Sequence, residues 1–166
     1  MEFTPLEKFS FYSKLQSDFL NRYSKEIFND LEAAMRVDST VDCTDFNNIW
    51  GKIWLWILGS YEIVRTMDQY KSCFSERLHP LIKETKSTLA DLRIPMAKQE
   101  KRGNKKGTVS EPSVASIDNE NKDFGYEVNG KILYFREIVH LYNQLIEELS
   151  DQDVLCSLDC HRAKSS

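Results

Sequence analysis

Apolar residues recur at three- and four-residue intervals in four stretches of the chain, which is the spacing of amphipathic helices. The first stretch opens with TPLE at residues 4–7, a threonine cap followed by a proline at the first helical position and a glutamate three residues after the cap. Its apolar stripe comprises Leu15, Phe19, Tyr23, Ile27, Leu31 and Ala34. The pattern predicts one helix from residue 4 to about residue 35, with a length of about 45 Å.

The second stretch, residues 46–67, contains the chain's three tryptophans and is apolar on more than one face. A turn-forming segment at residues 37–45 precedes it, and Thr44 or Asp45 can cap the helix. One face carries Trp50, Ile53, Trp54, Ile57, Tyr61 and Val64, and the other faces carry Leu55, Trp56, Leu58 and Ile63. A helix with so little polar surface is typical of the centre of a bundle.

Two further helices follow from the same spacing. The third has its apolar stripe at Leu78, Ile82, Leu89 and Leu92. Pro80 either opens or kinks this helix, and Pro95 is expected to end or bend it, since proline disfavours helical backbone at the residue before it. The fourth helix begins at Phe135 and runs to about Leu149.

Residues 99–123 are polar and contain glycines, serines and a proline, which predicts a flexible basic and polar connection. In residues 124–135, Asn129-Gly130 lies between two short alternating runs, a strong signal for a β-hairpin, which must pack on helices to be stable. Residues 154–166 are expected to form a loose C-terminal tail. The predicted fold is therefore mainly α, a single domain over residues 1–153 with a bundle of about four helices and a small β-hairpin before the last helix.

The composition of the chain indicates where in the cell the protein is expected to reside. The chain has 166 residues, the size of one domain, and its most apolar segment, residues 49–58, is interrupted by Lys52 and is well short of the roughly 20 residues of a membrane span. The first ten residues carry acids and a proline where a secretory signal needs a basic start and an apolar stretch. We therefore expect a cytoplasmic protein without membrane association, whose cysteines are free thiols: Cys43, Cys73, Cys156 and Cys160.

The net charge of −4 is unevenly distributed, because a basic run lies in the predicted connection. Together with a preceding arginine, this run supplies the candidate nucleic-acid or anion-binding residues Arg93, Lys98, Lys101, Arg102, Lys105 and Lys106. Such side chains can neutralise phosphates. The alternative is a solvated linker, with Arg93 and Lys98 complementing the dipole of a helix C-terminus.

Arg65 is a cation on the helix predicted to be central, where an unpaired charge would be costly. Glu62 and Asp68 lie three residues away on either side, so Arg65 is expected to form an ion pair; the alternative is a functional cation that lines an interhelical cleft. No metal site or cofactor is expected, because the histidines are scattered and the Cys156, Cys160 and His161 cluster lacks a second ligand pair.

Arg136 and His140 lie four residues apart at the start of the last predicted helix, hence on one face. This pair resembles the signature of the helical HEPN ribonucleases, in which an arginine precedes a histidine on a late helix by four to six intervening residues. Here three residues intervene, and Glu137 follows the arginine directly where the family has a polar residue. The resemblance implies a metal-independent ribonuclease with Arg136 and His140 as catalytic residues; the alternative is that Arg136 is an exposed residue and His140 a partly buried surface residue without a catalytic role.

The leading hypothesis for function is a non-enzymatic interaction protein. The tryptophan-bearing helix is more apolar than a four-helix monomer needs, and large uncovered apolar patches mark interaction sites. We therefore expect an aromatic-rich helical surface that binds a protein partner or forms a homodimer. The alternative is an RNA-binding protein or HEPN-like ribonuclease that uses the basic run or Arg136 and His140.

Overall fold

The computed structural model describes residues 4–35, 43–98, 100–101, 104–107, 114–128 and 130–163. Its main helices are α1 (Pro5–Phe9), α2 (Phe11–Ala34), α3 (Cys43–Gln69), α4 (His79–Lys98), α5 (Phe135–Glu147) and α6 (Leu158–Ala163). Two short 3-10 helices, η1 (Lys71–Cys73) and η2 (Glu76–Leu78), connect α3 to α4. The strands are β1 (Glu100–Lys101), β2 (Asn104–Gly107), β3 (Ser116–Asp118), β4 (Asp123–Val128) and β5 (Lys131–Tyr134). The predicted mainly-α fold, with strands before the last main helix, is confirmed.

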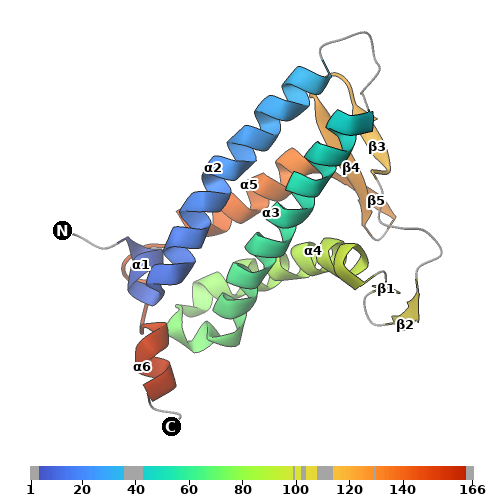
Figure 1. Cartoon of the computed structure of the whole chain (residues 1–166). Helices are drawn as coiled ribbons and strands as arrows, with labels where there is room; N and C mark the ends of the chain where they lie inside the picture. Colours follow the sequence, from blue (N-terminus) through green and yellow to red (C-terminus); the bar gives the residue numbers. More distant parts are fainter. Residues whose placement is uncertain are drawn as a thin grey trace.

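The helices α2 and α3 form a long antiparallel pair, with α5 and α4 packed beside them (Figure 1). Trp56 lies at the centre of the bundle and is fully buried, as expected for the tryptophan-bearing helix. Its indole N–H donates a hydrogen bond to the carbonyl oxygen of Leu20 at 3.0 Å, and its ring contacts Phe135 and Tyr142 of α5 edge to face. The core therefore joins α2, α3 and α5 around one indole.

The prediction of one helix from residue 4 to about 35 is wrong, because the helix is interrupted at Ser10. The backbone of Ser10 is extended, and its side chain caps α2 by accepting a hydrogen bond from the N–H of Ser13 at 3.2 Å. The short helix α1 changes direction relative to α2 and buries Leu6 and Phe9. The centres of the Phe9 and Phe74 rings are 4.6 Å apart. Burial of Phe9 thus accounts for the break.

The predicted hairpin is confirmed and belongs to a larger sheet. Strands β4 and β5 pair antiparallel from Gly125↔Tyr134 to Val128↔Lys131, and Gly130 takes the positive φ that the turn requires. Strand β3 adds a third antiparallel strand on β4, and β1 pairs with β2. Three of the strands therefore lie within residues 99–123, for which the sequence predicted only a connection.

Helix α4 differs from its prediction at one of its two prolines. Pro80 lies in the first turn and opens the helix, one of the two predicted outcomes. The helix does not end at Pro95 but continues to Lys98. Leu92 and Met96 are both buried, so packing on either side of the proline favours the continued helix.

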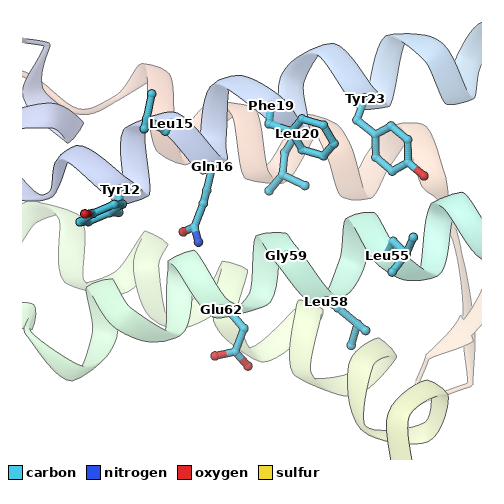
Figure 2. Close-up of a pocket in the computed structure, with 10 residues that line it drawn as sticks. All are labelled: Tyr12, Leu15, Gln16, Phe19, Leu20, Tyr23, Leu55, Leu58, Gly59 and Glu62. Carbon is cyan, nitrogen blue, oxygen red and sulfur yellow. The ribbon is translucent and has the colours of Figure 1, made fainter.

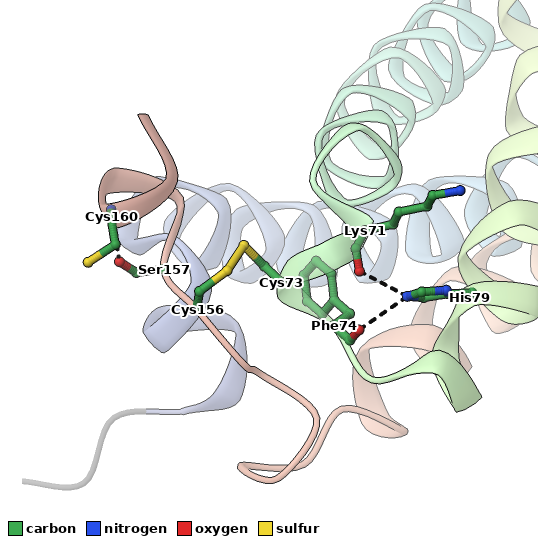
Figure 3. The surroundings of a disulfide bond; sticks show 7 residues. All are labelled: Lys71, Cys73, Phe74, His79, Cys156, Ser157 and Cys160. Atoms are coloured by element: carbon green, nitrogen blue, oxygen red, sulfur yellow. Dashed lines mark hydrogen bonds between the residues drawn. A yellow bond between two sulfur atoms is a disulfide. The ribbon is translucent and has the colours of Figure 1, made fainter. Parts of the chain in front are cut away.

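The expectation that all cysteines are free thiols is also wrong, because Cys73 and Cys156 form a disulfide (Figure 3). Backbone pairing brings them together: Phe74 bridges to Val154, and the N–H of Leu155 donates to the carbonyl oxygen of Cys73 at 2.9 Å. Cys160 is an exposed free thiol on α6. The segment from residue 154, predicted as a loose tail, is thus attached by a covalent bond and contains a helix.

Every helix in the described part of the chain is too short or too polar to cross a membrane.

Candidate interaction groove between helices α2 and α3

Along the first four turns of α2, the buried face carries small side chains and the solvent face carries large ones, the reverse of the usual arrangement. The buried face there carries the small polar residues Ser13, Ser17 and Ser24 together with Leu20. The solvent face carries large apolar side chains that are 49–76% exposed: Phe11, Tyr12, Leu15 and Phe19. Further along, Ile27 and Leu31 are fully buried, so the predicted stripe is core only in its second half.

The small buried residues have a packing reason. Ser17 accepts a hydrogen bond from the buried hydroxyl of Tyr142 at 3.0 Å, which links α2 to α5. On the α3 side, a Cβ added to Gly59 would lie 3.1 Å from a terminal methyl carbon of Leu20, so the two helices approach closely there. The Tyr142 side chain of α5 and the close approach of α3 at Gly59 thus occupy the space beside this part of the inner face.

An apolar groove of about 820 Å³ lies on the outer side of the α2–α3 contact (Figure 2). Leu20 and Gly59 lie at the contact itself, and the groove is lined from α2 by Tyr12, Leu15, Gln16, Phe19 and Tyr23 and from α3 by Leu55, Leu58 and Glu62. Leu55 is 52% exposed. From Tyr12 to Tyr23 the groove is roughly 16 Å long, because an α-helix rises about 1.5 Å per residue.

Charged clusters of opposite net sign flank the groove. At the Tyr23 end, Lys52 of α3 donates to both Glu26 and Asp30 of α2, and these hydrogen bonds, with Asp30 contributing most, raise the pKa of the Lys52 ammonium. The cluster of Glu26, Asp30 and Lys52 carries a net charge of −1, and we call it the acidic end.

The other cluster, at the Tyr12 end, comprises Glu62, Arg65 and Arg93, carries a net charge of +1, and is called the basic end. Arg65 forms an ion pair with Glu62 at 2.7 Å, which confirms the expected pairing, whereas Asp68 pairs with Lys86. Arg93 lies over the ring of Tyr61 at 5.0 Å and reaches Glu62 at 3.8 Å. Arg65 is therefore held by an ion pair within α3, and its partner Glu62 lines the groove.

Among the candidate anion-binding residues, Arg93 has its side chain held by Tyr61 and Glu62 of α3. The backbones of Lys101, Lys105 and Lys106 lie in the paired strands β1 and β2, and Lys98 is the last residue of α4. Arg102 lies outside the described residues. The strand pairing gathers the three lysines on one short hairpin.

Arg136 and His140, the candidate ribonuclease pair, have different surroundings. The Arg136 side chain donates to the carbonyl oxygen of Asn121 at 3.2 Å, lies 4.5 Å from the centre of the Phe28 ring and reaches Glu32 at 3.7 Å. His140 is exposed. The Arg136 side chain therefore links the last main helix to α2 and to the β3–β4 turn.

Comparison with protein-family models, with curated proteins and with solved structures finds no match for this chain.

Proposed function

We propose that the protein is an interaction module that binds a helix of a protein partner, or of another copy of itself, in the α2–α3 groove. The observation that carries this proposal is the exposure of Tyr12, Leu15 and Phe19 along the α2 side of the groove and of Leu55 on its α3 side, with Phe11 exposed next to Tyr12. The largest apolar patch on a soluble monomer is often its functional surface.

The groove has the dimensions that a helical ligand needs. An amphipathic helix docks through apolar anchors at positions i, i+3 or i+4, and i+7, which span about two turns. The exposed parts of the three aromatic rings and two leucines amount to roughly 500 Å² of apolar surface. At about 25 cal/mol per Å², their burial would contribute roughly 12 kcal/mol, which is comparable to the cost of association of about 4–15 kcal/mol that binding must offset.

A photoreactive amino acid in place of Leu15 tests this function. We expect it to crosslink to a protein in native lysate, whereas the same residue in place of Leu155, which is 63% exposed beside the disulfide, does not. Adding Leu58→Asp to the position-15 probe should abolish the crosslink, because a carboxylate would be placed in the groove. Equal capture from positions 15 and 155, or no capture from either, would refute the proposal.

A second candidate function, RNA binding, is supported by the three lysines on the β1–β2 hairpin. The triple change Lys101→Glu, Lys105→Glu and Lys106→Glu should then abolish retention of RNA, and the affinity of the unchanged protein should fall steeply with salt. Cleavage of RNA that is lost on changing Arg136 and His140 together to alanine would support the ribonuclease alternative. Protein that retains and cleaves no RNA would eliminate both.

A further inference from the structure

We infer that the occupant of the α2–α3 groove is a second copy of this chain, related by a two-fold axis so that the two α2 helices run antiparallel across it. This inference rests on the proposed function, since it specifies the partner of the same groove. It is supported by the charge at the two ends of the groove, by the register of the exposed side chains and by the area available.

The two ion-paired clusters at the ends of the groove carry complementary net charges. Glu62, which anchors Arg65 and Arg93 of the basic end, lines the groove near Gln16, and the acidic end of Glu26, Asp30 and Lys52 follows Tyr23 along α2 at its other end. When two copies pack antiparallel, the basic end of each protomer meets the acidic end of the other. A two-fold axis repeats a favourable pairing at both ends, as an isologous interface requires.

The side-chain register agrees with this arrangement when Phe19 lies on the axis. Tyr12 and Glu26 are each seven residues from Phe19, so they oppose each other across the interface, as do Leu15 and Tyr23 of the two copies. Within one protomer, α3 runs antiparallel to α2, with Lys52 beside Glu26 and Gly59 beside Leu20. Arg65 is therefore level with the first turns of α2 and comes within reach of Glu26 of the second copy.

The area fits a stable dimer. The groove and its flanks offer roughly 500 Å² of exposed apolar surface per protomer. The apolar share of a dimer interface is about 65%, so a patch of this size implies about 800 Å² per partner once a polar rim is included. This value is that of a standard specific interface.

Light scattering coupled to size exclusion tests the inference on the full-length protein. We expect a species of twice the 19.4 kDa chain mass that dissociates on dilution. Phe19→Glu should give a monomer, because it brings two carboxylates together on the axis. The matched control Leu155→Glu, on another surface, should leave the dimer intact, and circular dichroism of both variants shows that they are folded.

A charge exchange tests the antiparallel arrangement specifically. Arg65→Glu and Glu26→Lys should each weaken dimerisation by about 2- to 30-fold, because each changes two symmetry-related contacts between exposed groups. The double variant restores opposite charges at both ends and should recover most of the affinity. Failure of the double variant to recover, or a dimer that Phe19→Glu leaves intact, would overturn the inference.

A monomer at every concentration would also overturn the inference. In that case the position-15 probe decides the proposed function separately. A crosslink to a different protein would keep the interaction role and identify another occupant, whereas no crosslink would remove both proposals.

Discussion

Loss of the Cys73–Cys156 disulfide is expected to reduce stability by about 4.5 kcal/mol. The two cysteines are separated by 83 positions, and the entropy of closing a loop of this length in the unfolded chain gives that value at 25 °C. A single domain has a total unfolding free energy of about 5–15 kcal/mol, so the bond accounts for a large part of it. For a chain of this size the loss corresponds to a decrease in melting temperature of roughly 9–18 °C.

The variant Cys156→Ser tests this prediction with little disturbance of packing, since Cys156 is only half-buried and Cys73 can remain as a buried thiol. Thermal unfolding followed by circular dichroism should give the lowered melting temperature, and wild-type protein unfolded in reductant should match it. The control Cys160→Ser removes the exposed thiol and should leave the melting temperature unchanged. An unchanged melting temperature in Cys156→Ser would refute the reasoning.

Two further predictions concern buried polar groups. The Arg77 guanidinium, assisted by Ser150 and Ser75, holds the pKa of the Asp153 carboxyl well below its usual range. As the pH falls, the Asp153 carboxyl is therefore protonated in the unfolded chain before it is protonated in the folded protein, and the unfolding free energy should decrease below about pH 4. Asp153→Asn should remove this contribution to the pH dependence of the unfolding free energy, measured by urea titrations at several pH values. A pH dependence identical in both proteins would contradict this. Tyr142→Phe should cost about 1 kcal/mol, measured by urea unfolding, because it leaves the buried Ser17 hydroxyl without its donor; a double variant with Ser17→Ala should be less destabilised than the two single changes together.

Periodicity and turn chemistry predicted the helices and the hairpin because those signals are local. The apolar spacing located α3 around the buried Trp56, and Asn129-Gly130 located the β4–β5 turn. The disulfide was missed because it depends on a backbone bridge between Phe74 and Val154, which lie 80 positions apart. Strand β3 was missed for the same reason: its three residues are extended because they pair with β4, and their own sequence carries no strand signal.

The residues that line the groove from α2 were assigned to a buried stripe for a different reason. The spacing of Leu15 and Phe19 continues into Ile27 and Leu31, so the sequence presents one apolar stripe where the structure has an exposed half and a buried half. The signal that separates the halves is the run of serines at positions 13, 17 and 24, which has helical spacing and marks an inner face that must be small. Ser17 on this face packs against the large side chain of Tyr142, so small residues at helical spacing here mark the buried side of the helix.

The cytoplasmic location expected from the sequence stays a prediction, and the disulfide now makes it testable. Disulfides are rare in the reducing cytosol and persist in oxidising compartments, so the Cys73–Cys156 pair reports where the folded chain resides. Cells can be lysed in denaturant with a thiol-alkylating reagent, after which mass spectrometry measures the alkylated fraction of Cys156. Full alkylation would support the cytoplasm and imply that the protein there lacks about 4.5 kcal/mol of stabilisation. Protection of Cys156, with Cys160 alkylated in the same molecules as the internal control, would place the protein in an oxidising compartment and contradict the expected location.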